Sequence, residues 1–473
     1  DAWLNAVVAE HGGVDGRRGR EVSRPETMNS SRALHEIPDT TILVDFFYRP
    51  KAEAGFDYVL THFHGDHYGR LSEAWDAPIH CSPLTGRLAA AVLGVRPDLI
   101  RHHDIGEKFE LGGATVMFID AEHCPGAVML LATPNGMQVQ HMHTGDCRAT
   151  PKLLSALEHL ENRKVHTLLL DSTYALSKSS FPAQDEVIEK VCADVSHISE
   201  ASLILIAAYS VGKERVILRA AERIDCQIYV GSERKSNIYR VLDLSADEQR
   251  RFTSDPAKAR IHIVPFHFCG EIWPYFQPNF RKCEELLDTL PMFDAVVGIL
   301  PTGHADASNW NRKHEVVSRG RVTLRLYPYS EHSSAKELSS LVGCVKPVKL
   351  VPTVFRDTKE QQAIVRKFQP LLDQAGAMQQ LFASSTGSSL AAKVSNPVEA
   401  ADSGSKKRCW SGKRLAEAAV ASPLSGVVTI ALESDDDDGP QDVVACVEEV
   451  AAEIQPPPAK SSRQAEADEG ELQ

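Results

Sequence analysis

Residues 61–67 read THFHGDH, which places three histidines and one aspartate within six positions. The preceding YVL at residues 58–60 is apolar and typical of a strand. Because side chains alternate along a strand, a strand that continues into the motif turns His62 and His64 to the same side. Imidazole and carboxylate groups are ligands for zinc and similar cations. The motif therefore predicts a metal site; the alternative is a histidine-rich loop in solvent.

Later segments offer the further donors that a pair of ions would need. Asp66 and His67 lie beyond the turn and can hold a second ion. His123 in AEHCPG offers a third imidazole, Asp146 in HTGD a bridging carboxylate, and His332 in PYSEHSS one more imidazole. Taken alone, each of these three is more often a hydrogen-bonded loop residue. Their order after the first motif makes them candidate ligands.

The composition is that of an intracellular enzyme with two or three domains. Of 473 residues, 43% are hydrophobic and 24% are charged. No apolar run approaches the ~18 residues of a membrane span. The ten cysteines are scattered without a CxxC pair, which predicts reduced thiols in the cytosol or nucleus. The first residues lack a signal-peptide pattern, although the chain starts at Asp1 rather than Met.

The net charge of −13 is concentrated near the C-terminus. Residues 386–473 contain 16 acidic and 8 basic side chains, so they carry −8 of the total. The other 385 residues are nearly balanced at −5. Net charge therefore neither supports nor excludes a nucleic-acid substrate.

The hydrophobic pattern predicts an α/β fold. Strands are expected at residues 42–47, 168–170, 203–207, 296–300, 322–326 and 349–351. Helices are expected at residues 181–195, 214–224 and 359–372. Residues 1–40 are expected to form a mobile lead-in. Residues 386–473 are rich in Ser, Ala, Pro and acidic side chains, which predicts a disordered acidic C-terminal tail.

Several strings run in the order of a known family. They are THFHGDHYGRL, DAEHCPGAVM, HTGDCR, LDSTY, FPAQDEV, YSVGKERV, PTG, PYSEHSS and KLVPTV, and the resemblance that they carry covers about residues 45–382. The chain resembles the metallo-β-lactamase fold and, within it, the β-CASP DNA nucleases that include Artemis and Apollo. The best match is to the 5′-exonucleases of DNA interstrand cross-link repair.

This resemblance implies an αββα metallo-β-lactamase sandwich with an inserted α/β β-CASP domain. The sandwich would comprise residues 41–193 and 319–385, and the β-CASP domain residues 194–318. Residues 1–40 and 386–473 would lie outside both domains.

The resemblance also implies roles for individual residues. One metal would be held by His62, His64 and His123, and the other by Asp66, His67 and His332, with Asp146 between them. The catalytic residues would be Asp66, Asp45, Asp171 and His332, with Asp45 orienting ligands and Asp171 beside the metals. Val354 lies where RNA-processing members carry His, so it favours a DNA substrate.

A pocket for a terminal 5′-phosphate is expected at the start of the second α/β segment. Ser210, Gly212 and Lys213 lie between a predicted strand and a helix, where backbone N–H groups can face an anion. The resemblance implies such a pocket, which Thr173, Tyr174 and Ser333 would complete. The alternative is an ordinary helix start.

The function expected is that of a zinc-dependent 5′-to-3′ DNA exonuclease in cross-link repair. The expected cofactor is one or two zinc ions, with magnesium possible at the second site. A water molecule activated by these ions would attack a backbone phosphorus in line. The products would be a 3′-hydroxyl and a new 5′-phosphate. The alternatives are an Artemis-like hairpin-opening endonuclease, a β-CASP RNA-processing nuclease and an inactive DNA-binding scaffold.

The tail carries weaker signals. Basic residues 406–408 and 413–414 resemble a nuclear address, although solvated charge is an equal alternative. Residues 427–430, VVTI, precede the acidic run 435–438, a pattern that could add a strand to a SUMO-like partner. The expected partners are therefore DNA with a free 5′-phosphate and a SUMO-like protein. A nuclear monomer without membrane association is expected.

Overall fold

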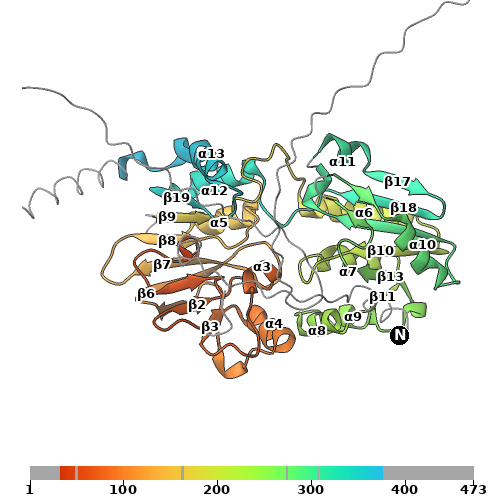
Figure 1. The fold of residues 1–473 in the computed structure, drawn as a ribbon, viewed down its shortest axis with the longest axis horizontal. Coiled ribbons are helices and arrows are strands. Elements are labelled where there is room, and N and C mark those ends of the chain that lie inside the picture. Colours follow the sequence, from red (N-terminus) through yellow and green to blue (C-terminus); the bar gives the residue numbers. More distant parts are fainter. Residues whose placement is uncertain (1–31, 48–51, 161–164, 273–274, 307, 377–473) are drawn as a thin grey trace, which may run out of the picture. The chain divides into compact units, whose positions relative to one another are not determined.

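The computed structural model describes residues 32–47, 52–160, 165–272, 275–306 and 308–376 (Figure 1). Within these ranges strands and helices alternate in a mixed α/β fold, as the hydrophobic pattern predicts. Among the described helices, none combines the length and the apolar character that a membrane span requires.

Two sheets share an apolar core. The first is parallel, in the order β1 (Ile42–Val44), β2 (Asp57–Val59), β3 (Ile79–Cys81) and β4 (Ile100–His102). The second has the order β19 (Lys349–Pro352), β9 (Val165–Leu170), β8 (Gln140–His143), β7 (Val128–Pro134), β6 (Ala114–Asp120) and β5 (Lys108–Leu111). Ile42 and Val44 of the first sheet lie in one buried cluster with Val116 and Phe118 of the second. The apolar faces of the two sheets therefore pack together.

A third sheet has seven strands. Its order is β12 (Phe252–Thr253), β11 (Gln227–Val230), β13 (Ala259–Val264), β10 (Ser202–Ala207), β16 (Ala295–Pro301), β18 (Val322–Tyr327) and β17 (Val316–Arg319). Strand β18 pairs with β16 in parallel from Val296↔Val322 to Pro301↔Tyr327. The sheet therefore continues beyond residue 318, the end expected for an inserted domain. Alternation along β18 predicts a strand but not the sheet that it joins. A short pair, β14 (Gly270–Glu271) and β15 (Gln277–Pro278), is separate.

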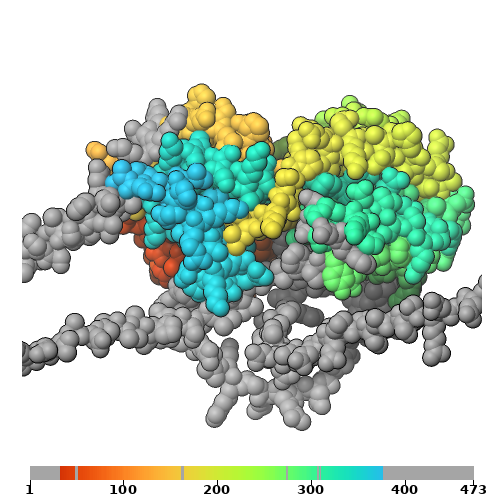
Figure 2. Space-filling view, turned by 90° about the horizontal axis from the view of Figure 1, so that it is seen from above, coloured from red at the N-terminus to blue at the C-terminus, as the bar shows by residue number. Residues whose placement is uncertain are grey.

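The helices of the described ranges connect these strands. They are α3 (Gly65–Tyr68), α4 (Pro83–Leu93), α5 (Pro151–Glu158), α6 (Gln184–Ser196), α7 (Glu214–Arg223), α8 (Glu233–Val241), α9 (Ala246–Gln249), α10 (Phe280–Asp288), α11 (Asn309–Lys313), α12 (Ala335–Val345) and α13 (Thr358–Phe368). Helix α13, blue in Figure 2, lies at the surface beside the cyan segment that contains α12. Both helices contact the 3₁₀ helix η4 (Gln369–Leu371).

Two boundaries differ from the sequence prediction. Helix α6 begins at Gln184 rather than near residue 181, because Pro182 precedes it in an extended connection and accepts a hydrogen bond from Arg148 on its carbonyl. Residues 32–40, expected in a mobile lead-in, contain the fully buried Ile37. In the same segment Glu36 forms an antiparallel bridge with Leu43.

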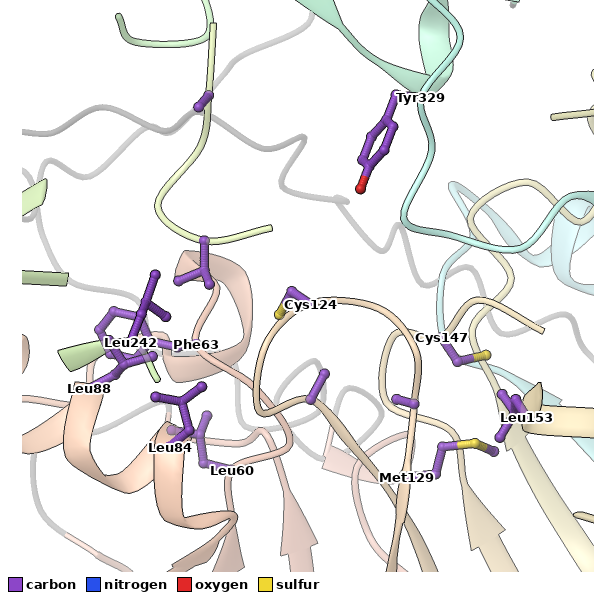
Figure 3. Close-up of a cluster of buried hydrophobic side chains, with 14 of the residues drawn as sticks. Leu60, Phe63, Leu84, Leu88, Cys124, Met129, Cys147, Leu153, Leu242 and Tyr329 are labelled. Atoms are coloured by element: carbon purple, nitrogen blue, oxygen red, sulfur yellow. The ribbon is translucent and has the colours of Figure 1, made fainter. Parts of the chain in front are cut away.

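The largest core connects the metal motif to helices on either side of it. Leu60, Phe63, Leu84, Leu88 and Leu242 lie together in Figure 3 and belong to one buried cluster. Leu84 and Leu88 are on α4, and Leu242 directly follows α8. This core holds the histidine-bearing loop in place.

Candidate metal centre

The motif at residues 61–67 lies between β2 and the short helix α3. Phe63 is fully buried, whereas the rings of its neighbours His62 and His64 lie 4.7 Å apart. The apolar side chain thus anchors the loop to the core while the two imidazoles lie together, as the strand alternation predicts. Asp66 and His67 follow in the only turn of α3.

One carboxylate oxygen, Asp146 Oδ2, lies among the imidazoles. Its distances are 3.2 Å to His67 Nε2, 3.7 Å to His62 Nε2, 3.8 Å to His123 Nε2 and 3.8 Å to His332 Nε2. His64 Nδ1 lies 3.1 Å from His123 Nε2, and Asp66 Oδ2 lies 3.4 Å from His67 Nε2. The structure therefore brings together all seven side chains that the sequence proposes as ligands.

The second ring nitrogen of each imidazole is held by an oxygen of the protein. His62 Nδ1 lies 2.9 Å from Thr61 Oγ1, His64 Nε2 3.0 Å from Val211 O, His67 Nδ1 2.7 Å from Asp45 Oδ2, His123 Nδ1 3.0 Å from Glu331 O, and His332 Nδ1 3.0 Å from Asp171 Oδ2. An N–H on these nitrogens leaves the lone pair of the opposite nitrogen for a cation. All five opposite nitrogens belong to the cluster around Asp146.

The Asp45 side chain holds both ends of the metal motif through hydrogen bonds. Its φ of 52° lies in the left-handed region, which is strained for a side chain other than glycine and is often found at functional sites. Its Oδ1 accepts from Thr61 N at 2.7 Å, and its Oδ2 accepts from Thr61 Oγ1 at 2.6 Å. Because Oδ2 also accepts from His67 Nδ1, this one carboxylate positions both ends of the motif.

Asp171 plays the corresponding part for His332. Asp171 follows β9 and is buried, and its Oδ1 accepts from both the backbone and the hydroxyl of Thr173. Its Oδ2 accepts from His332 Nδ1. Helix α12 begins just after His332 with Ser334 as N-cap, in a capping box with Glu337. The turn that carries His332 is therefore fixed on both sides.

The charges of the cluster account for the histidine pKa values. Burial and the neighbouring imidazoles hold the pKa of His62 and His123 well below its ordinary value. Burial also disfavours the charged form of His67, but the surrounding carboxylates, Asp146 foremost, outweigh burial and hold its pKa well above the ordinary value. The metal-free cluster thus retains a proton that a divalent cation would displace.

The donor set fits a metal ion. Donor atoms lie within 4.8 Å of one another in four groups: His62, His64, His123 and Asp146; Asp45, His62 and His67; Asp66, His67 and Asp146; and Asp146, Asp171 and His332. His62 Nε2 is buried and has no hydrogen-bond partner among the described residues. A buried polar atom without a partner costs about 1–3 kcal/mol and is uncommon. A cation at this position would satisfy it, and mixed imidazole and carboxylate donors suit zinc.

The ligand set of His332 stays a prediction. The resemblance implies that His332 shares an ion with Asp66 and His67. His332 Nε2 lies 3.8 Å from Asp146 Oδ2, the same oxygen that is 3.2 Å from His67 Nε2, whereas Asp171 contacts the opposite nitrogen, His332 Nδ1. Asp66 has a side chain 40% exposed, so among these carboxylates it is the one open to solvent.

Three of the expected 5′-phosphate residues are buried and hydrogen-bonded within the chain, whereas Thr173 is exposed. Lys213 is buried, and its ammonium lies 2.5 Å from Glu331 Oε2. Gly212 N donates to Glu214 Oε2 at 2.7 Å. Ser333 is buried, and its hydroxyl donates to Cys147 O at 2.8 Å. The groups expected to meet a phosphate therefore already contact other parts of the chain.

The other expected substrate residues lie near the cluster. The Tyr174 ring is 6.1 Å from that of His332 and 5.8 Å from that of His304. Ser210 Oγ donates to Phe63 O at 3.4 Å, next to the metal motif. The Ser172 hydroxyl, next to Asp171, donates to Val354 O and accepts from Val354 N.

Sequence reasoning missed three groups that position the imidazoles. They are the Thr61 hydroxyl, the Val211 carbonyl and the Glu331 carbonyl. Thr61 lies directly beside His62, so a hydroxyl next to a proposed ligand was an available signal. The two carbonyls carry no such signal, because any residue has one and only the fold places it.

Comparison with known proteins gives one family. The DNA repair metallo-beta-lactamase family matches residues 246–358. DNA ligase 6 of Arabidopsis thaliana is 34% identical over 365 residues, which cover 74% of this chain and 25% of that protein. DNA cross-link repair 1A protein of Homo sapiens is 31% identical over 374 residues, covering 76% of this chain and 34% of that protein. The 5′ exonuclease Apollo of Gallus gallus is 30% identical over 325 residues, covering 68% and 63%. The match thus spans less than two thirds of each of these relatives.

Proposed function

Because this chain belongs to the DNA repair metallo-β-lactamase family, we propose that it is a metal-dependent 5′-to-3′ DNA exonuclease acting in interstrand cross-link repair. The observation that carries the proposal is the set of five imidazole nitrogens around Asp146, each fixed through its opposite nitrogen. The direction of attack and the repair role rest on the names of relatives, which include a 5′ exonuclease and cross-link repair proteins.

The domain arrangement is proposed on the same basis. The first two sheets and their helices would form the αββα sandwich, and the seven-stranded sheet the inserted β-CASP domain. We place the end of the insertion after β18, near residue 328, because β17 and β18 pair within the seven-stranded sheet.

Zinc bound at the cluster would polarise the phosphate oxygens of the substrate and acidify a water molecule. His62, His64 and His123 would hold one ion, and Asp66, His67 and His332 would hold a second. Asp146 would be a ligand candidate for either ion. Asp45 and Asp171 accept hydrogen bonds from Nδ1 of His67 and His332, which leaves the two Nε2 atoms to face Asp146. Asp66, whose side chain is 40% exposed, would hold the attacking water together with its neighbours in the cluster. Cleavage would leave a 3′-hydroxyl and a new 5′-phosphate, and magnesium at a second position is part of the same proposal.

Recognition of a terminal 5′-phosphate remains a proposal. Thr173, which is exposed, and Tyr174, which is half-buried, are its best candidates, because Lys213 and Ser333 are buried. The proposed preference for DNA over RNA rests on Val354, which lies where RNA-processing members of the resembling family carry His. Comparison of oligonucleotides that carry a 5′-phosphate or a 5′-hydroxyl tests the pocket: Thr173→Ala should reduce the preference for the phosphate. Equal cleavage of both oligonucleotides by the wild type would remove the pocket from the proposal.

The decisive experiment for the activity uses 5′-labelled and 3′-labelled single-stranded DNA with zinc or magnesium. Stepwise release of mononucleotides from the 5′ end is expected, and Asp146→Asn should abolish it by removing the central carboxylate charge. The matched control is Asp243→Asn, which removes an exposed carboxylate paired with Arg87. A hairpin with blocked ends separates the rival function: cleavage only at the hairpin would identify an endonuclease.

The proposals on the tail concern residues outside the described ranges. They are the basic residues 406–408 and 413–414 as a nuclear address, and residues 427–438 as a strand for a SUMO-like partner. We also propose that the protein is monomeric. Fluorescence localisation with and without residues 406–414 tests the address.

A further inference from the structure

A buried ion pair joins the seven-stranded sheet to the turn that carries His332. Lys213 directly precedes α7 and is 3% exposed, and Glu331 is 5% exposed. The Lys213 ammonium lies 2.5 Å from Glu331 Oε2. It also lies 5.3 Å and 5.2 Å from the ring centroids of Tyr209 and Tyr329. At these distances the ammonium is stabilised by cation–π interactions with the two rings.

Stability alone does not account for this pair. Removing two charges from water costs about as much as their attraction returns, and apolar residues of similar size are often equally stable. Here the carboxylate is only half satisfied, since Glu331 Oε1 is buried without a hydrogen-bond partner in the described part of the chain. The pair therefore contributes geometry rather than net folding energy.

The geometry it fixes belongs to two ligand candidates. Glu331 O accepts from His123 Nδ1 at 3.0 Å, and Val211 O accepts from His64 Nε2 at 3.0 Å. His64 and His123 are neighbours, with Nδ1 and Nε2 3.1 Å apart. Each imidazole is thus oriented by a carbonyl on a different backbone segment, and the Lys213–Glu331 contact links these two segments.

Gly212 allows the two segments to approach so closely. Its φ is 115°, and a Cβ added to it would lie 2.2 Å from Glu331 Oε1. Any larger residue would displace the carboxylate, because no real Cβ contact is that short. The backbone at residues 211–213 and the Glu331 side chain are therefore fitted to each other.

We infer that the Lys213–Glu331 pair is a positioning device for the metal centre, which sets the His64 and His123 imidazoles at the spacing that one ion requires. The inference rests on the proposed function, because it assigns the pair to that same metal site. It is an alternative to the expected role of Lys213 as a phosphate ligand, and the test below separates the two roles. Lys213 and Glu331 are positioning residues that act through two backbone carbonyls.

The test measures metal binding in Lys213→Met, Glu331→Gln and a control, Arg219→Met. Arg219 lies on α7, the helix that Lys213 precedes, and its ion pair with Glu189 is about half exposed. Affinity for zinc is measured by competition with a chromogenic chelator, and geometry by the visible absorption spectrum of the cobalt form. Residues that orient metal ligands typically contribute 10-fold to 100-fold to metal affinity. We expect a loss of about this size and an altered cobalt spectrum in both pair variants, with no change in the control.

Three results would overturn the inference or its premise. Wild-type affinity and an unchanged cobalt spectrum in both pair variants would refute the positioning role. If Lys213→Met kept that affinity but lost its preference for 5′-phosphate DNA, the lysine would be a phosphate ligand instead. A wild-type protein that binds no zinc would refute the proposed function itself. If Lys213→Met fails to fold, Glu331→Gln, nearly identical in shape, decides the question alone.

Discussion

Replacing Asp45 with asparagine should impair the metal centre without removing a ligand. The Asp45 carboxylate is 6% exposed and accepts three hydrogen bonds. Asparagine has the same shape but accepts on one side only. If its oxygen faces His67, its NH₂ opposes the N–H of Thr61. If its NH₂ faces His67, the imidazole must move its proton to Nε2, the nitrogen that faces Asp146.

The size of the effect follows from these two arrangements. A buried polar group left without its partner costs about 1–3 kcal/mol. A residue that orients a metal ligand typically contributes 10-fold to 100-fold to affinity, which is about 1.4–2.8 kcal/mol. The two estimates agree, so Asp45→Asn should weaken zinc binding about 10-fold to 100-fold. At zinc concentrations below the new dissociation constant, nuclease activity should fall by the same factor.

Zinc affinity is measured by chelator competition, and cleavage is followed on 5′-labelled DNA over a range of zinc concentrations. Excess zinc should restore part of the activity of Asp45→Asn, because the donor set is still present. Asp243→Asn is the matched control, because Asp243 is 74% exposed and pairs with Arg87, which is not a proposed ligand. Zinc affinity within about 2-fold of the wild type, with an unaltered cobalt spectrum, would show that the Asp45 carboxylate does not determine the orientation or the protonated nitrogen of the His67 ring.

Three further outcomes follow from the same structure. Nearby carboxylates hold the pKa of His67 well above its ordinary value in the metal-free protein, so zinc binding near pH 7 should release a proton and strengthen as pH rises. Calorimetry in two buffers of different ionisation enthalpy measures that proton, and a binding enthalpy independent of the buffer would contradict the prediction. Burial, with Glu331 nearby, raises the pKa of Glu214 from 4.5 to about 7, so ionisation of its carboxyl destabilises the fold increasingly as the pH rises between these values. Glu214→Gln should therefore raise the unfolding temperature at pH 8 more than at pH 5, and an equal rise at both pH values would refute this effect of ionisation. A chain ending at residue 382 should cleave short DNA at the wild-type rate; an inactive truncation would show that the tail contributes to catalysis.

The local sequence was sufficient for the elements and for the ligand types. Strands β10 and β16 and helix α7 lie within one or two residues of the expected ranges, because hydrophobic periodicity reports which side of an element is buried. The alternation in the metal motif likewise predicted that His62 and His64 would lie together. These are properties of neighbouring residues, which the chain order displays directly.

Contacts between distant segments could not be read in this way. Lys213 in SVGK is predicted from the sequence to contact a 5′-phosphate, and nothing nearby in the chain indicates Glu331, the partner that lies 118 positions away. The alternation of β18 gave a strand but not its place beside β16. Which carbonyl orients an imidazole is equally invisible, since every residue offers the same group.

The chain order by itself therefore determined the chemistry of the centre: imidazoles and carboxylates in a pattern that calls for a divalent cation. Tertiary structure decided how those groups are held, through Asp45, Asp171, Thr61 and two backbone carbonyls. The physical reason is that ligand identity belongs to a side chain, whereas the direction of its lone pair depends on a hydrogen bond that the packed fold supplies.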